Sequence, residues 1–319
     1  MNNILAIVIP AYKAAFFDEC LSSISRQTNH NFKLYIGNDN STDDLEAIVN
    51  KYRSEINIEY KKFDENLGSV SLVKQWERCI QMTAGEEWIW LFSDDDTMDV
   101  NCVDTFYQEQ SKGEKINVYR FNLQLISADN RIIRTSIYPR FETASDFILN
   151  KLNMKFDSAI SNYIFRKEQY VKSGFREFPL AWGTDDAAVC EFTDDKNISA
   201  IQGAMVQWRI SDSNISSVGN CENQKLKVHA RLAFLAWLYS SDKFHKLKLS
   251  ENRKLVLKWM MNSIEKEYLG FSTYEKKQLY DKTSKIVGKS ARLYRAKALF
   301  TKFTNSASSA KKKLFAKKW

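Results

Sequence analysis

Glycine, proline and histidine are scarce in this sequence: its 319 residues include 10 Gly, 3 Pro and 3 His. The low Gly and Pro content excludes a collagen-like or linker-rich chain, and three isolated histidines do not form a histidine-rich metal site. No run reaches the roughly 18 to 20 apolar residues that span a bilayer. The N-terminal apolar run follows no basic region and stops at Pro10, so it predicts a buried strand rather than a signal peptide.

Cysteine is also limited in number and in pattern. The five Cys, at positions 20, 79, 102, 190 and 221, are odd in number, widely spaced and without a C-x-x-C pair. This pattern argues against a disulfide framework and against a zinc ribbon. We therefore expect the protein in a reducing compartment, the cytoplasm.

The formal net charge of +8 comes from the C-terminal end of the sequence. Residues 290–319 contain nine Lys or Arg and no Asp or Glu, whereas the first 289 residues have a formal net charge of −1. Because this body has no basic stripe, we expect no nucleic-acid partner. With 44% apolar and 13% aromatic residues, the chain can bury a substantial core.

The first 100 residues alternate between strand and helix patterns. The expected strands are 4–9, 32–36, 56–61 and 88–92, and the expected helices between them are 17–27, 43–53 and 70–83. This alternation indicates βαβ units, and hence an α/β fold with a mixed, largely parallel sheet flanked by helices. The remaining elements expected are a hairpin over 118–137, strands over 158–166 and 205–210, and helices over 223–239, 251–269, 273–287 and 291–304.

Polar residues follow each of the first four expected strands. Ligands of parallel sheets bind at the carboxyl ends of the strands, so these loops form the candidate site. They are Pro10-Ala-Tyr12, Asn38-Asp-Asn-Ser-Thr-Asp43, Asp64-Glu-Asn-Leu-Gly68 and Ser93-Asp-Asp-Asp96.

The aspartate triplet, Asp94 to Asp96, places three like charges in one turn. Their repulsion is relieved by a divalent cation. Mg²⁺ and Mn²⁺ prefer oxygen ligands and, when bound by one or two carboxylates, retain positions for phosphate oxygens. The alternative is a solvated acidic turn that caps the next helix.

A second acidic element, Asp185 and Asp186, follows Trp182 and Gly183. Either carboxylate can cap the helix expected after it, or act as a general base toward a hydroxyl group. Trp182 can stack on a sugar or belong to the core.

In their order and spacing, the four loop motifs resemble the nucleotide-sugar half of the inverting family 2 glycosyltransferases, which have the GT-A (Rossmann-like) fold. The resemblance covers residues 3–100 well and 158–216 more loosely. It implies a nucleoside pocket lined by Pro10, Ala11 and Tyr12. It further implies that Asp39 accepts a hydrogen bond from the base, and that Asn66 and Gly68 belong to a loop over the nucleotide.

The same resemblance assigns the acidic residues. The triplet corresponds to the D-x-D-type motif, with Asp94 and Asp95 toward the nucleotide and Asp96 and Asp95 as ligands of Mn²⁺ or Mg²⁺. The alignment of the triplet with this motif can shift by one residue, because Ser93 can occupy the first aspartate position. Asp186 is favoured over Asp185 as the catalytic base, and Trp182 faces the acceptor.

Two further residues carry expectations from this resemblance. Asn38 departs from the family, which often has aspartate there, and an amide would read a base edge differently from a carboxylate. Arg209 resembles a residue near the end of the catalytic domain, where it would lie near the diphosphate.

We expect three regions: a GT-A domain over 1–216, a helical region over 217–289 and a basic amphipathic tail over 290–319. The tail interleaves Lys and Arg with Leu, Tyr and Phe, which suits an anionic membrane surface. It would place the protein peripherally on the inner face of the cytoplasmic membrane. A solvated tail and a nucleic-acid-binding tail are the alternatives.

The expected function is a metal-dependent inverting glycosyltransferase. It would move a sugar from a nucleotide-diphosphate donor, expected to be UDP-linked, to a glycan or lipid-linked acceptor in bacterial surface polysaccharide synthesis. A nucleotidyltransferase is disfavoured because Pro10-Ala-Tyr-Lys13 is not a Gly- and Lys-rich phosphate loop. A non-catalytic nucleotide-sugar-binding protein is the other alternative.

Overall fold

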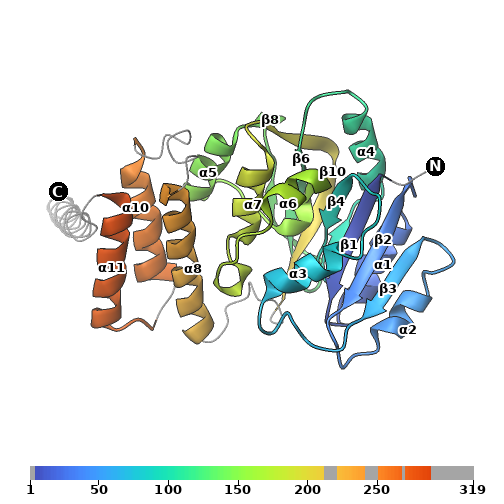
Figure 1. The fold of residues 1–319 in the computed structure, drawn as a ribbon, viewed down its shortest axis with the longest axis horizontal. Helices are drawn as coiled ribbons and strands as arrows, with labels where there is room; N and C mark the ends of the chain where they lie inside the picture. The colour runs from blue at the N-terminus through green and yellow to red at the C-terminus, as the bar shows by residue number, and fades with distance from the viewer. Residues whose placement is uncertain (1–3, 212–220, 241–250, 268–269, 289–319) are drawn as a thin grey trace, which may run out of the picture. The chain divides into compact units, whose positions relative to one another are not determined.

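The computed structural model of the chain describes residues 4–211, 221–240, 251–267 and 270–288 (Figure 1). The chain divides into two compact units, residues 1–219 and 220–319. The expected domain boundary at residue 216 and the whole of the basic tail lie outside the described residues. None of the helices in the described ranges combines the length and the apolar character that a bilayer-spanning segment requires.

The first half of unit 1 alternates strands and helices as the sequence predicts. Its elements are β1 (Leu5–Ala11), α1 (Phe17–Ser25), β2 (Phe32–Asn38), α2 (Leu45–Asn50), β3 (Ile58–Lys62), α3 (Leu72–Ile80) and β4 (Trp88–Leu91). β1 pairs in parallel with β2 on one side and with β4 on the other, and β2 pairs in parallel with β3. The expected parallel sheet is therefore confirmed in this half.

The second half of unit 1 extends the same sheet with mixed strand directions. It comprises β5 (Thr97–Met98), α4 (Cys102–Gln110), β6 (Val118–Ser127), β7 (Ile132–Ser136), β8 (Phe141–Glu142), α5 (Ala144–Leu152), η1 (Ile160–Asn162), β9 (Tyr163–Arg166), α6 (Lys167–Ser173), η2 (Pro179–Ala181), α7 (Thr184–Phe192) and β10 (Ile198–Ile210). The strand order is β3-β2-β1-β4-β9-β6-β10-β5, with β7 beside β6 and β8 beside β10. β9 is antiparallel to both neighbours.

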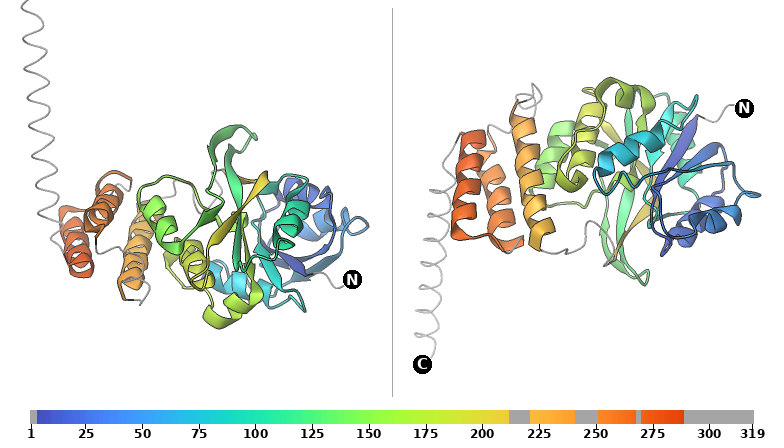
Figure 2. Two further views of the ribbon diagram at one scale, coloured as in Figure 1. Left: turned by 90° about the horizontal axis from the view of Figure 1, so that it is seen from above. Right: turned by 60° about the horizontal axis from the view of Figure 1, so that its bottom comes forward.

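Helices cover both faces of this sheet (Figure 2). Alternate residues of β1, namely Leu5, Ile7 and Ile9, belong to one buried cluster with residues of α1 and α4. α3 packs against β1, β2 and β4 and approaches Gly37 of β2 through Cys79. The alternation of side chains along a strand thus assigns α1 and α4 to one face and α3 to the other.

Two elements differ from the sequence-based prediction in their extent. The strand expected over 158–166 is the short turn η1 followed by β9. The last strand begins at Ile198 rather than at Met205. A register shift between Ile201 and Met205 interrupts its pairing with β6. A bulge of this kind breaks the alternation of apolar and polar residues by which a strand is detected.

Unit 2 is helical, as expected. Its described elements are α8 (Cys221–Ser240), α10 (Arg253–Asn262), the π-helical turn η3 (Ser263–Glu267) and α11 (Thr273–Val287). α11 contacts both α8 and α10. α11 begins with a capping box formed by Ser272 and Glu275 and ends at Gly288, whose φ is 65°, as these two signals dictate. The helix expected over 291–304 lies outside the described residues.

The close contact between β2 and α3 predicts a cost for adding one methyl group. A Cβ on Gly37 would overlap Cys79 Sγ and lie 2.9 Å from the Phe63 ring. We expect Gly37→Ala to lower the free energy of unfolding by about 1–3 kcal/mol, the usual cost of overpacking a core. Gly85→Ala is the matched control, because a Cβ there meets nothing within 4 Å. Urea unfolding followed by tryptophan fluorescence measures both, and equal stabilities would contradict the packing described.

Candidate active site

Asp94 joins the carboxyl ends of β1 and β4. Its Oδ2 accepts hydrogen bonds from the backbone N–H groups of Tyr12, at 2.7 Å, and Lys13, at 3.0 Å. The chain leaves β1 toward β2 on one side and returns to β4 on the other, which makes this the topological switch point where such sheets bind ligands. Burial raises the pKa of Asp94, while the two amide hydrogen bonds lower it.

Asp39 fixes the loop that follows β3. Its carboxylate accepts hydrogen bonds from the N–H groups of Leu67 and Gly68, both at 2.8 Å. It also forms an ion pair with Arg78 of α3 at 2.5 Å, and the two side chains are only 5% and 15% exposed. Burial raises the pKa of Asp39, and these three donors lower it.

The neighbours of Asp39 have structural contacts of their own. Asn38 is buried; its amide donates to Tyr60 Oη at 2.8 Å and accepts from the Ser41 N–H at 2.8 Å. Asn66 accepts from the Ser69 N–H at 2.9 Å within the loop. Asn38, the departure from the family pattern, therefore supports the turn after β2.

Asp95 and Asp96 have different surroundings. Asp96 is fully buried, and its Oδ1 accepts a hydrogen bond from the Arg209 N–H at 2.9 Å. Its Oδ2 is buried without a hydrogen-bond partner among the described residues. Asp95 is partly exposed. Burial is the main cause that raises the pKa of both carboxyls, that of Asp96 to about 7, and repulsion from Asp96 and Asp94 raises the pKa of Asp95 further.

These carboxylates suit a hard cation bound together with a phosphate group. The described residues contain no group of three or more His, Cys, Asp or Glu that could hold a metal ion. One or two carboxylates suffice for Mg²⁺ or Mn²⁺ when substrate phosphates complete the coordination. The buried Asp96 Oδ2, which lacks a partner, and the partly exposed Asp95 fit such a site.

The second acidic element begins helix α7 after an unusual turn. Leu180, Ala181 and Gly183 have φ values of 58°, 52° and 91°. Left-handed backbone at residues other than glycine costs free energy, and its presence is a common mark of functional sites. The turn places Trp182 in a partly exposed position and brings Asp185 and Asp186 into the first turn of α7.

Asp186 and Asp185 differ in accessibility. Asp186 is 2% exposed and binds Lys151 of α5 at 2.5 Å and the Ser158 hydroxyl at 3.3 Å. Asp185 is partly exposed. Burial, followed by repulsion from Asp186, raises the pKa of Asp185 to about 7, and Lys151 lowers it. Of the two, Asp185 can therefore meet a substrate and exchange a proton near neutral pH.

The short segment 158–162 connects the two acidic elements. Ser158 donates to Asp186, while Ser161 accepts from the Ser93 N–H and donates to the Ser93 hydroxyl, both at 3.1 Å. The Ser161 carbonyl also accepts from the Trp90 indole at 2.7 Å. Ser158 and Ser161 are three positions apart in the chain, so one short segment contacts both acidic elements.

Sequence reasoning did not identify Arg78, Lys151, Ser158 and Ser161. They lie outside the loops after the four predicted strands, and α5 itself was not predicted. Arg209, expected near the diphosphate, is fully buried and binds the main chain of the triplet.

Comparisons with known proteins identify the family and the fold. The sequence model described as glycosyl transferase family 2 matches residues 6–170. The chain belongs to this family, as its motifs predict. Glycosyltransferase GlyG of Streptococcus pneumoniae serotype 4 is 27% identical over 110 residues, which are 34% of this chain and 36% of that protein.

Solved structures show the same fold at low sequence identity. S. aureus TarS 1–349 in complex with UDP-GlcNAc aligns with a TM-score of 0.62 at 15% identity, covering 88% of this chain and 80% of that one. A mannosyltransferase from Pyrobaculum calidifontis in complex with GDP-Man and Mn²⁺ aligns with a TM-score of 0.51 at 13% identity, covering 92% and 83%. The expected GT-A fold is therefore confirmed.

The buried pair of Asp39 and Arg78 predicts strong energetic coupling. Removing one partner leaves the other charge buried and uncompensated. We expect Asp39→Asn and Arg78→Met each to lower the free energy of unfolding. In the double variant, the loss should be about 1–3 kcal/mol smaller than the sum of the two single losses. Urea unfolding of the four proteins measures this coupling.

A control cycle uses an exposed pair. Lys51 Nζ and Asp18 Oδ1 lie 3.0 Å apart, and the two side chains are 58% and 53% exposed. Their coupling should be about 0–1 kcal/mol, as for other surface pairs. Additive effects of the Asp39 and Arg78 substitutions would show that this ion pair does not hold the loop.

Proposed function

We propose that this family 2 glycosyltransferase transfers a sugar from a nucleotide-diphosphate donor to an acceptor hydroxyl, with inversion at the anomeric carbon. The observation that carries the proposal is the segment 158–162, which contacts Ser93 beside the triplet and Asp186 beside Asp185. A phosphate-binding element and a candidate base at one edge of the sheet are what a single displacement requires.

The donor would bind at the switch point between β1 and β4. Pro10, Ala11 and Tyr12 would line the nucleoside pocket, and Asp39, Asn66 and Gly68 would form its other side. Tyr12 is 39% exposed, so its ring is available to a ligand. A UDP-linked donor is proposed because the similar TarS structure contains UDP-GlcNAc.

Asp95 would be the main protein ligand of a Mn²⁺ or Mg²⁺ ion, with Asp96 behind it and Asp94 holding the β1 loop. When bound, the ion would stabilise the negative charge of the departing diphosphate. This assignment follows from exposure, because Asp95 is partly exposed whereas Asp96 is fully buried.

On the acceptor side, Asp185 would remove the proton from the attacking hydroxyl group. The new bond from the acceptor oxygen to the anomeric carbon forms while the bond to the phosphate oxygen breaks, and the proton passes to Asp185. Asp186, held by Lys151 and Ser158, would keep the first turn of α7 in place. Trp182 would contact the acceptor sugar.

We propose a glycan or lipid-linked acceptor used in bacterial surface polysaccharide synthesis. The relative GlyG is a bacterial glycosyltransferase, and the basic sequence of residues 290–319 suits an anionic membrane surface. Thermal unfolding with a panel of nucleotide sugars and Mn²⁺ tests the donor class, because a bound donor raises the unfolding temperature. No stabilisation by any member would refute it.

Substituting each carboxylate separately tests which one is the base. Asp185→Asn should lower kcat by about 10²- to 10⁴-fold, the usual contribution of a general base, while UDP affinity stays unchanged. Asp186→Asn, the matched control, keeps the side-chain size but loses the charge partner of Lys151, so it should lower stability more than kcat. Release of UDP measures kcat, and calorimetry measures affinity.

The opposite result, with the larger loss of kcat in Asp186→Asn, would restore Asp186 as the base that the sequence favours. Full activity in both variants would refute the proposal of a carboxylate base in α7. A protein that binds UDP-sugars but transfers none would instead be the non-catalytic alternative.

The pKa of Asp185 predicts a pH dependence. A base acts when deprotonated, so kcat/KM should rise as the pH passes through about 7, the pKa of this carboxyl. Lys151 lowers that pKa, because its positive charge favours the carboxylate. Lys151→Met should therefore move the rise to higher pH. Lys172→Met is the control, since Lys172 pairs with Asp194 at the surface; equal profiles for wild type and Lys151→Met would contradict this role.

A further inference from the structure

Arg209 is a buried cation at the end of β10, beside the aspartate triplet. Its side chain is fully buried, although an unpaired charge in such a position is costly. The guanidinium donates hydrogen bonds to three separate parts of unit 1. A group of this kind is retained only if its hydrogen bonds are satisfied.

The first set of contacts reaches the triplet itself. Arg209 Nε donates to the Asp95 carbonyl oxygen at 2.9 Å, and the Arg209 backbone N–H donates to Asp96 Oδ1 at 2.9 Å. One residue therefore fixes both the main chain of Asp95 and the side chain of Asp96.

The second set reaches the tip of the β6–β7 hairpin and helix α1. The guanidinium donates to the Ala128 carbonyl at 3.2 Å, to Asn130 Oδ1 at 2.7 Å and to Glu19 Oε2 at 2.9 Å. It also lies over the Phe16 ring, 4.4 Å from its centroid.

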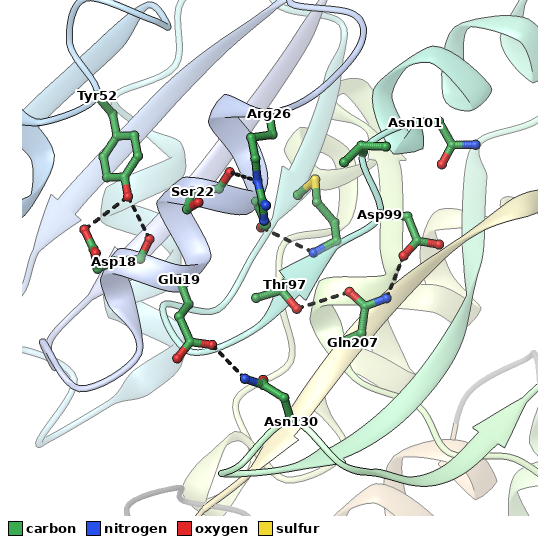
Figure 3. A pocket seen from close by; sticks show the side chains of 13 residues that line it. Asp18, Glu19, Ser22, Arg26, Tyr52, Thr97, Asp99, Asn101, Asn130 and Gln207 are labelled. Carbon is green, nitrogen blue, oxygen red and sulfur yellow. Dashed lines mark hydrogen bonds between the residues drawn. The ribbon is translucent and has the colours of Figure 1, made fainter.

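Figure 3 shows the outer end of this network, where Asn130 donates to Glu19 at 3.3 Å beside a cavity of about 640 Å³. The same view shows Thr97 donating to Gln207 at 3.1 Å and Gln207 donating to Asp99 at 2.8 Å. These bonds tie β10 to β5, the strand that directly follows the triplet. The position of Arg209 relative to the triplet is therefore fixed by the contacts of β10 with β5 and by the contacts of the guanidinium with the hairpin and Glu19.

We propose that Arg209 is the positioning residue that holds Asp95 in the orientation needed to bind the metal ion with the donor diphosphate. This inference rests on the proposed function. It assigns to Arg209 a role through the protein chain rather than a contact with the diphosphate, because its side chain has no exposed surface and its guanidinium donates to Asp95, to the β6–β7 hairpin and to Glu19.

The planar guanidinium is essential to this role. It offers five donors in a fixed plane, whereas lysine offers a single ammonium group on a flexible chain. Lysine can keep the charge near Glu19 but cannot at the same time reach Asp95, Ala128 and Asn130. Arg209→Lys should therefore release the triplet while it preserves the charge.

The test measures UDP binding by calorimetry, with Mn²⁺ and with EDTA. For Arg209→Lys we expect UDP affinity in Mn²⁺ to fall by about 10- to 100-fold, the range found when partners that orient metal ligands are removed. Affinity in EDTA should stay unchanged. Glu19→Gln, at a residue whose side chain is 49% exposed, should show a smaller loss in the same direction and guards against misfolding of the lysine variant.

Arg120→Lys is the matched control for losing a buried arginine. Arg120 is also fully buried, pairs with Glu142 at 2.8 Å and lies over the Tyr138 ring, but none of these contacts is with the triplet. It should lower the unfolding temperature and leave the ratio of UDP affinities in Mn²⁺ and EDTA unchanged. A merely structural role of Arg209 would give the same pattern as Arg120.

The inference is overturned if Arg209→Lys and Glu19→Gln keep the wild-type ratio of UDP affinities in Mn²⁺ and EDTA. If Arg209→Lys does not fold, Glu19→Gln decides alone. If Mn²⁺ has no effect on UDP binding by the wild-type protein, the proposed metal-dependent function fails, and this inference fails with it. That outcome is measured on the wild type alone, so it is distinct from a failure of the Arg209 inference by itself.

Discussion

The site depends on the hydrogen bonds between one carboxylate and two backbone amides at the switch point of the sheet. Asp94 accepts from Tyr12 and Lys13, and so ties the loop after β1 to the loop after β4. Parallel pairing aligns the ends of these strands, but it does not fix the loops beyond them. The Asp94 bonds supply that constraint, and they hold the loop after β1 against the triplet.

The acidic residues divide into those held by the protein and those left accessible to a ligand. Asp39, Asp94, Asp96 and Asp186 are bound by Arg78, by backbone amides or by Lys151. Asp95 and Asp185 are partly exposed, as is Asp94, whose Oδ2 is nevertheless held by the Tyr12 and Lys13 amides. In each acidic element a fixed carboxylate thus lies next to an accessible one. This division, more than the number of acids, supports the proposed roles of Asp95 and Asp185.

The sequence predicts the first half of the fold well, because β1 and β4 are apolar runs, β2 and β3 have shorter strand patterns, and helical patterns lie between them. It does not predict the bulged start of β10 or the short helices α5 and α6, whose patterns are too brief or too irregular to stand out. The loops at the strand ends are correctly located. The difference in accessibility between Asp185 and Asp186 is not evident from sequence, because it depends on Lys151 and Ser158, distant residues that the fold brings to Asp186.

The hydroxyl contacts of residues 158–162 have a consequence for how enzymes of this design can diversify. Ser161 is anchored to the strand that carries the triplet, and Ser158 is anchored to helix α7. Exchanging α7 and its preceding turn for those of another family member would also remove one of these two anchors. A hybrid that keeps these contacts must therefore carry residues 151–192 as one block, because Lys151 and Ser158 both bind Asp186 of α7.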